Sequence, residues 1–325
     1  MMNTAIKALK HEISNRVHDV SFKTGISRYK TLRSPSARVI MFHGIGGPDC
    51  PADIFESQMR YLKENYPVIS LKKALAVSSD INDKFRTDVV LTFDDGLRNN
   101  FTTAYPILSR YRLPATFFVC PGLIESQKWQ WVYEIEQRLL ICSEIDLESI
   151  GKLFNIVLPT TKGNNSRDIV EILIDHMKTM ETEHRMKFEN TIRALTKNFE
   201  ATSLQRDSFD TMNWDELCSL PPDLVTIGSH TVNHPILTKI PYEEMRYQIK
   251  ESRQWLEKRL NRPVEYFCYP NGNYDTSIVS VVAENYKAAV STNPGFFDHG
   301  DDVYQINRIP AADSLPLFAW RMFRP

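Results

Sequence analysis

Two adjacent carboxylates, Asp94 and Asp95, lie where a β-strand should end. They follow the strand-like run 88–90 within the stretch 91–96, and Gly96 comes directly after them. A strand end turns into a loop, so both side chains can point into one cavity, and Gly96 allows the backbone to turn. Repulsion between the carboxylates would raise one pKa unless a cation lies nearby. We therefore predict that one Asp binds a metal ion and the other stays free as a base.

A second group, His230 and His234, follows the short apolar run 224–227. If this segment turns helically, residues four apart lie on one face, and two imidazoles with one carboxylate leave a coordination position open for water. Such a pair on its own is more often incidental than functional. Together with the Asp pair at another strand end, it favours a metal site.

Both groups lie in motifs that resemble the first two motifs of the polysaccharide deacetylases, carbohydrate esterase family 4: Thr92-Phe93-Asp94-Asp95-Gly96 and His230-Thr231-Val232-Asn233-His234-Pro235. The resemblance spans about residues 39–308. It implies an α/β fold, a distorted (β/α) barrel of about seven strands, that binds one divalent metal ion. It also implies that Asp94 is the general base, that Asp95, His230 and His234 are the metal ligands, and that Thr231 holds the metal loop by hydrogen bonding. Zinc is the expected ion, although this ligand set also suits other first-row divalent metals.

A third candidate element is the turn Pro270-Asn271-Gly272, which follows the apolar run 264–269. Its backbone N–H groups could face the negative charge that develops in an acyl intermediate, or the segment could be an ordinary turn. By resemblance this is the third family motif, in which the backbone amide of Asn271 completes an oxyanion hole. We include Tyr269, at the end of the preceding run, among the candidate substrate contacts.

The sequence departs from this third motif at its first position, where Cys268 replaces an Arg that orients the base in the family. Another residue must then restrain Asp94. Arg308 lies on the last expected strand, and a guanidinium can bind a carboxylate through two parallel hydrogen bonds. We predict that Arg308 restrains Asp94; a surface ion pair is the alternative.

The family's usual last motif, a strand ending in Leu-x-x-His near the C-terminus, is missing, because no His follows Arg308. His43, after the apolar run 39–42, has the same form at the opposite end of the chain. The first and last strands of a closed barrel are neighbours, so a circular permutation could leave this side chain over the same cavity. We predict that His43 is the general acid that protonates the leaving amine; a structural role beside Gly44 is the alternative.

These residues need parallel strands whose carboxyl ends meet. Apolar, strand-like runs alternate with helical periodicity, which gives the β-α-β order of a parallel barrel whose active site lies at the strand ends. The runs are 38–43, 88–90, 114–119, 224–227, 264–269 and 304–310, with helices expected at 54–62, 104–111 and 241–260.

The length of 325 residues and the hydrophobic content of 42% fit one large domain, residues 1–325. The 39 basic and 40 acidic residues give no global field that would attract nucleic acid, so no nucleic-acid partner is expected. The five scattered cysteines indicate neither a disulfide framework nor a zinc ribbon, and suit a cytoplasmic protein with reduced thiols. The sequence contains neither the apolar stretch of a signal peptide nor a run approaching the ~20 residues of a membrane span.

Two regions lie outside the barrel pattern. Residues 1–37 read as a basic amphipathic helix with apolar residues at helical spacing, which either pack on the barrel or contact a membrane surface; these residues are Ile6, Leu9, Ile13, Val17 and Val20. Residues 125–212 are expected to form a helical insertion that shapes the substrate cleft. Trp129 and Trp131 at its start could both face a sugar if the backbone is extended there, or could belong to a core.

The function expected from these features is metal-dependent removal of an N-acyl group, in the first instance acetyl, from an amino sugar. The substrate would be an intermediate of surface-polysaccharide or glycoconjugate synthesis, and the basic N-terminal helix suits a lipid-linked or phosphorylated one. The alternatives are O-deacetylation, hydrolysis of a non-sugar amide, or a catalytically inactive sugar-binding protein. The sequence leaves the oligomeric state open.

Overall fold

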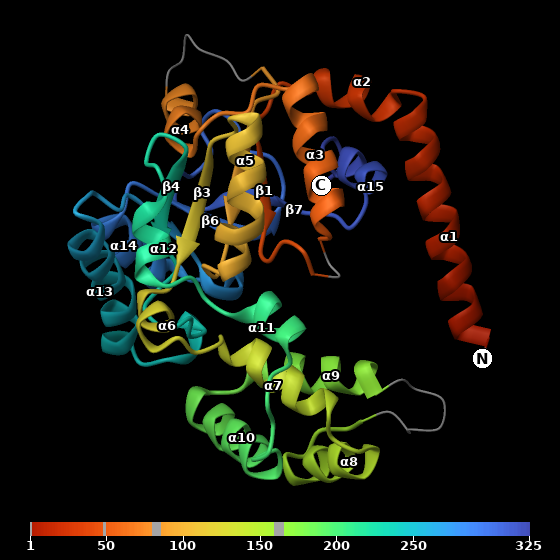
Figure 1. Ribbon diagram of the computed structural model, residues 1–325, viewed down its shortest axis with the longest axis vertical. Coiled ribbons are helices and arrows are strands. Elements are labelled where there is room, and N and C mark those ends of the chain that lie inside the picture. The colour runs from red at the N-terminus through yellow and green to blue at the C-terminus, as the bar shows by residue number, and fades with distance from the viewer. Residues whose placement is uncertain (1, 48–49, 80–85, 159–165) are drawn as a thin grey trace.

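The computed structural model describes residues 2–47, 50–79, 86–158 and 166–325, with side chains from residue 12 onward. Its centre is a closed barrel in which parallel strands follow one another in chain order and the last pairs with the first (Figure 1). The described strands are β1 (Arg38–Phe42), β2 (Val89–Phe93), β3 (Ala115–Val119), β4 (Val225–Ser229), β5 (Tyr266–Cys268), β6 (Ala288–Pro294) and β7 (Ile306–Pro310). The prediction of a (β/α) barrel of about seven strands is confirmed.

The strands are short apolar runs because both of their faces are buried, as is usual for parallel sheets enclosed by helices. On the outer face, the ring of Phe42 lies 5.3 Å from Phe55 of the surrounding helix layer and 5.0 Å from Phe93 of the next strand. On the inner face, Arg308 of β7 reaches side chains on β2 and β5, which are not its neighbours in the sheet. Arg308 therefore crosses the interior of the barrel.

Helices alternate with the strands, as the sequence pattern predicts. In α13, Pro241 occupies the N-cap, and Asn261 ends the helix in the left-handed conformation with φ of 50°. The connecting helices are α3 (Ala52–Asn65), α4 (Leu71–Ser79), the π-helix η1 (Asn100–Ala104), α5 (Tyr105–Tyr111), α6 (Pro121–Ser126), α12 (Trp214–Ser219), the 3-10 helix η2 (Leu237–Lys239), α13 (Tyr242–Leu260), the 3-10 helix η3 (Pro270–Gly272), α14 (Thr276–Asn285) and α15 (Leu315–Arg321).

The chain between α6 and α12 forms helices with an apolar core of their own, built around residues such as Ile135, Leu173 and Phe188. These helices lie beyond the carboxyl end of β3, below the barrel in Figure 1. They are α7 (Trp131–Leu140), α8 (Glu144–Leu153), α9 (Ser166–Thr179), α10 (Thr182–Leu195) and α11 (Ser203–Phe209). Part of the insertion expected at 125–212, residues 159–165, lies outside the described residues.

The N-terminal region forms α1 (Met2–Lys23) and α2 (Ile26–Leu32), joined through Gly25 with φ of 73°. The α1 helix lies at the edge of the molecule (Figure 1), where the ring of His18 lies 5.0 Å from that of Trp320 of α15. Three apolar residues of the expected stripe are about half exposed: Ile13, Val17 and Val20. The side chains of Ile6 and Leu9 lie outside the described residues. Among the helices described, none combines the length and the hydropathy that crossing a bilayer requires.

Candidate active site

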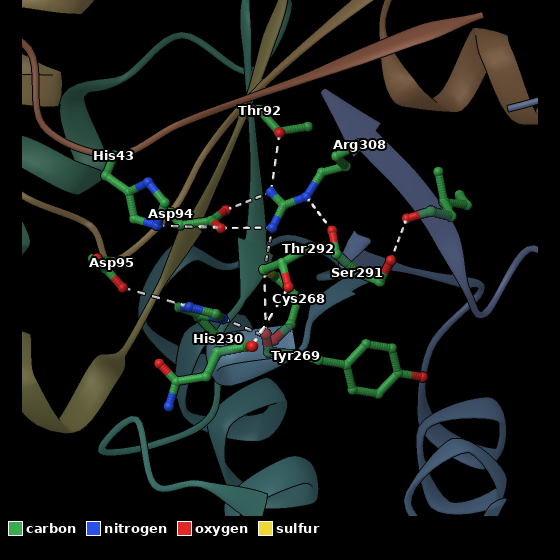
Figure 2. A network of polar contacts seen from close by, with 12 residues as sticks. His43, Thr92, Asp94, Asp95, His230, Cys268, Tyr269, Ser291, Thr292 and Arg308 are labelled. Atoms are coloured by element: carbon green, nitrogen blue, oxygen red, sulfur yellow. Dashed lines mark hydrogen bonds and ion pairs between the residues drawn. The ribbon is translucent and has the colours of Figure 1, made fainter. Parts of the chain in front are cut away.

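The carboxyl ends of the strands bring the predicted polar residues together inside one end of the barrel. His43 follows β1, Asp94 follows β2, His230 follows β4, and Arg308 lies on β7. In Figure 2, Asp94 lies between His43 and Arg308. Residues that are far apart in the sequence thus form one cluster because the barrel is closed.

The Asp94 carboxylate is bound by Arg308 through two parallel hydrogen bonds, 2.8 Å from Nη1 to Oδ1 and 2.7 Å from Nη2 to Oδ2. The remaining N–H groups of Arg308 are also used: Nε donates to the Ser291 carbonyl at 2.6 Å, Nη1 to Thr92 Oγ1 at 3.1 Å, and Nη2 to Cys268 Sγ at 3.3 Å. A guanidinium has five N–H donors, so every one of them has a partner. Cys268 of β5 thus contacts a guanidinium that comes from β7.

Asp94 is ionised at neutral pH although it is only 2% exposed. Burial by itself would raise the pKa of this carboxyl, but the charge and hydrogen bonds of Arg308 outweigh burial, and the pKa is lowered. On the side away from Arg308, His43 Nε2 lies 4.0 Å from Asp94 Oδ2, and the His43 side chain is 46% exposed. The strand before His43, β1, pairs with β7. A circular permutation that moved the last strand to the front requires this pairing of the first and last strands.

The Asp95 carboxylate points to a separate group of ligand atoms, because the backbone turns sharply at this residue. Asp95 has φ of 73° and Gly96 has φ of 67°, two consecutive residues in the left-handed region. Asp tolerates this region better than most residues. As a result Asp95 Oδ1 lies 3.5 Å from Nε2 of both His230 and His234.

The segment that carries the two imidazoles is not a helical turn, so the expected geometry of residues 230–234 was wrong. Thr231 and His234 both have positive φ, 66° and 56°, which a helix excludes. Thr231 Oγ1 instead accepts a hydrogen bond from the His234 N–H at 3.0 Å, and the amide oxygen of Gln248 accepts two more backbone N–H groups of this turn. The hydroxyl of Thr231 and the amide of Gln248 therefore set the spacing of the imidazoles.

These three side chains fit a divalent metal ion. Donor atoms of Asp95, His230 and His234 all lie within 4.8 Å of one another, and all three residues are buried. His230 Nδ1 donates to the Cys268 carbonyl at 2.7 Å, which leaves the lone pair of Nε2 directed to the site. Burial and the neighbouring His230 lower the pKa of His234 to about 3, whereas Cys268 and Asp95 outweigh burial and raise the pKa of His230, so an ion would displace a proton from His230 Nε2 on binding.

A second group, made up of Asp94, His230 and Cys268, also satisfies the distance condition for a metal. Its carboxylate is already occupied by Arg308, and burial raises the pKa of the Cys268 thiol, which keeps it protonated. The group with Asp95 is therefore the better metal site.

Two side chains of the insertion also reach Asp95, and the sequence analysis missed both. Tyr133 Oη donates to Asp95 Oδ2 at 2.5 Å, and Gln130 Nε2 donates to Oδ1 at 3.1 Å. Nothing in the local sequence distinguishes them from other polar residues of a helix. Their contact with Asp95 depends on how the insertion docks onto the barrel.

The candidate substrate contacts have different surroundings. Trp129 is half-buried, its Nε1 donates to Asp210 at 2.7 Å, and its ring lies 5.5 Å from Phe209. Trp131 is the first residue of α7, and its ring is buried in the core of the insertion under the guanidinium of Arg185. The two tryptophans thus do not share an extended segment, and Trp131 has no free face for a sugar.

Tyr269 is fully buried, and its hydroxyl donates to the Tyr304 carbonyl at 2.9 Å. Its ring points away from the Asp94–His230 cluster in Figure 2. Asn271 lies in η3 just beyond β5, with φ of 53°. Its side-chain Nδ2 is buried and has no hydrogen-bond partner among the described residues.

The chain is a closed parallel barrel with a polar cluster at the carboxyl ends of its strands, which is where the active sites of barrel enzymes lie. The family model for polysaccharide deacetylase matches residues 82–141 and 162–289, and the chain therefore belongs to the polysaccharide deacetylase family. The matched stretches include both Asp and both His of the cluster. His43, which follows β1, and Arg308, on β7, lie outside them.

Individual relatives agree with this assignment. YxkH of Bacillus subtilis, whose name assigns it to the same family, is 20% identical over 291 residues, which cover 88% of this chain and 75% of the relative. The deacetylase PplD of Streptococcus pyogenes, solved in complex with acetate, gives a TM-score of 0.58 at 20% identity over 89% of this chain and 99% of that one. IcaB from Ammonifex degensii gives 0.58 at 15% identity over 89% and 98%. At these identities the structural likeness shows a common fold.

Proposed function

We propose that this chain is a metal-dependent deacetylase that removes an N-acyl group, in the simplest case acetyl, from an amino sugar. The observation that supports this most is the division between two adjacent carboxylates. Asp94 is bound by a guanidinium, whereas Asp95 faces two imidazoles. Neighbouring groups in such different surroundings suit a base and a metal ligand, respectively.

In this proposal Asp95, His230 and His234 hold one divalent ion, and zinc is our choice for a site of two imidazoles and one carboxylate. The ion, when bound, would polarise the acyl carbonyl and acidify a water molecule. A base whose pKa is lowered, such as Asp94, takes a proton poorly from ordinary water. In this proposal Asp94 therefore needs a water molecule that a bound ion has acidified, and it lies beside the residues that would hold the ion.

The residues around Asp94 suit the remaining steps of amide hydrolysis. Asp94 accepts the proton of the attacking water, and Arg308 keeps the carboxylate in one orientation. His43, 4.0 Å from Asp94 and partly exposed, protonates the leaving amine. The backbone amide of Asn271, beyond β5, stabilises the tetrahedral oxyanion. Trp129 offers an aromatic face to the sugar ring.

The direct test is acetate release by the zinc-reconstituted protein from a panel of N-acetylhexosamines in free, nucleotide-linked, lipid-linked and oligomeric form. O-acetylated sugars and non-sugar amides complete the panel. We expect release from at least one N-acetyl sugar and none with Asp94→Asn. Release from only the O-acetyl or non-sugar substrates would assign a different hydrolase activity. Sugar binding without any release would make the chain a binding protein.

We further propose that the substrate is an intermediate of surface-polysaccharide or glycoconjugate synthesis, handled in the cytoplasm at the inner face of the membrane. The family description supports a carbohydrate substrate, and five scattered cysteines without a Cys-x-x-Cys motif suit a reducing compartment. Cell fractionation tests the location: recovery of the chain outside the cytoplasmic and inner-membrane fractions would contradict it.

The N-terminal helices supply the membrane contact in this proposal. Apolar side chains of α1 and α2 line a cavity of about 410 Å³ together with Trp320, and between residues 12 and 33 five Lys or Arg accompany two acidic residues. Exposed apolar groups among cations suit an anionic lipid surface. We expect pelleting with anionic vesicles that weakens with salt and with Val17→Asp. Absence of pelleting with any vesicle would remove this contact.

A further inference from the structure

Both oxygens of the Asp95 carboxylate accept a hydrogen bond from one short segment of the insertion. Tyr133 Oη lies 2.5 Å from Oδ2, and Gln130 Nε2 lies 3.1 Å from Oδ1. Asp95 is 3% exposed and Gln130 is 5% exposed, so little water competes for these bonds. The Tyr133 distance is that of a charge-assisted bond from a hydroxyl to a carboxylate, which is among the stronger hydrogen bonds of proteins.

The segment is held firmly where it meets the barrel. Gln130 is the N-cap residue of α7, and Tyr133 lies in the first turn of the same helix. The Tyr133 ring stacks on Phe209, with centroids 4.9 Å apart and planes at 22°, and the preceding Trp129 donates to Asp210. These contacts fix the direction in which the Tyr133 hydroxyl points.

The two oxygens of Asp95 are not equivalent. Oδ1 lies 3.5 Å from Nε2 of both His230 and His234, whereas Oδ2 is the acceptor of the Tyr133 hydroxyl. With Oδ2 held by the Tyr133 hydroxyl, Oδ1 would be the oxygen of Asp95 available to an ion. Coordination positions then stay open for a water molecule and for the acyl oxygen of a substrate.

We propose that Tyr133 is a positioning residue that holds Oδ2 of Asp95, so that Oδ1 alone faces the metal. Gln130, the N-cap residue of the same helix, donates to the same carboxylate through Oδ1. This inference rests on the metal site of the proposed function and goes beyond it, because it makes the helical insertion a part of that site. In this arrangement the barrel supplies the ligands and the insertion sets how one of them binds.

The critical variant is Tyr133→Phe, which removes the hydroxyl and keeps the ring on Phe209. We expect its zinc dissociation constant, measured by competition with a chromogenic chelator, to rise about 10–100-fold, the usual effect of losing a partner of a metal ligand. In the cobalt-substituted protein, binding through both oxygens would raise the coordination number, so the visible absorption should become weaker and shift.

The matched control is Gln137→Ala on the same helix, because Gln137 bonds to Gln205 within the insertion and not to Asp95. Its zinc affinity and cobalt spectrum should equal those of the wild type. A Tyr133→Phe protein with wild-type zinc affinity and cobalt spectrum would overturn the inference, and so would an equal loss in Gln137→Ala. A wild-type protein that binds zinc but releases no acetate would refute the proposed function and leave the positioning role standing. A wild-type protein that binds no metal would overturn both.

Discussion

Replacing Arg308 by Met should be among the most damaging single changes to the stability of the barrel. Arg308 is fully buried and Asp94 is 2% exposed, so the variant keeps a buried carboxylate that has lost its two strongest hydrogen bonds. Three further acceptors lose a donor as well. Breaking one partner of a buried ion pair costs about 3–5 kcal/mol, and the number of lost bonds favours the upper part of that range.

The loss should depend on pH in a defined direction. The wild-type Asp94 has a lowered pKa, so its contribution to stability is present above the ordinary carboxyl pKa of about 3.9 and disappears as the pH falls through the lowered value. Without Arg308, burial raises the pKa of Asp94 above about 3.9. As the pH falls, protonation then removes the buried charge, and the variant regains part of the stability that it lost. The difference in stability between wild type and variant is therefore largest near neutral pH and shrinks toward pH 4.

The assay is chemical denaturation in the presence of EDTA at several pH values, for the wild type, Arg308→Met, Asp94→Asn and the double variant. In the double variant neither charge is left buried alone, so its loss should be smaller than the sum of the two single losses. A loss below about 1 kcal/mol for Arg308→Met, or one independent of pH, would refute the account of this pair. Normal turnover by Arg308→Met after zinc loading would refute its role in orienting Asp94.

Other changes separate the remaining roles. Asp94→Asn should abolish turnover yet retain zinc, and loss of zinc would place Asp94 among the ligands. His43→Ala should lower turnover about 10²–10⁴-fold with zinc intact, the usual effect of removing a positioned acid; unchanged turnover or lost metal would exclude that role. His234→Ala should lose zinc by elemental analysis, and EDTA should inactivate the wild type reversibly; activity that survives EDTA would contradict a metal-dependent reaction. Trp129→Ala should raise KM with little change in kcat, whereas a fall in kcat alone would contradict sugar stacking.

Much of the barrel could be predicted because its strands are buried on both faces and therefore read as continuous apolar runs, as in 114–119. The β6 strand, rich in Ala, Ser and Thr, carries a weaker signal, and the sequence analysis did not single it out. The Asp and His groups were recognisable because their residue types and their places after apolar runs constrain the chemistry. Arg308 followed from Cys268, since the loss of one guanidinium beside a buried carboxylate requires another.

What could not be predicted depends on backbone conformation and docking. Positive φ at Thr231 is rare for a β-branched residue, so no propensity indicates it. The contact between Tyr133 and Asp95 arises only when the insertion docks on the barrel. The direction of Tyr269, by contrast, could have been inferred from strand alternation. Cys268 faces the interior and contacts Arg308, so the next residue, Tyr269, faces outward.

The closure of β7 onto β1 has a consequence for how the protein is made. Asp94 and Arg308 are separated by 214 positions, so a nascent chain that has been synthesised only through β6 contains the carboxylate but not its guanidinium. Such a chain has an open sheet with two unpaired edges, on β1 and β6, that could pair with other chains. The final strand removes these edges and supplies the guanidinium that binds the Asp94 carboxylate. Premature termination before residue 306 would therefore release a fragment with open sheet edges and with Asp94 unpaired.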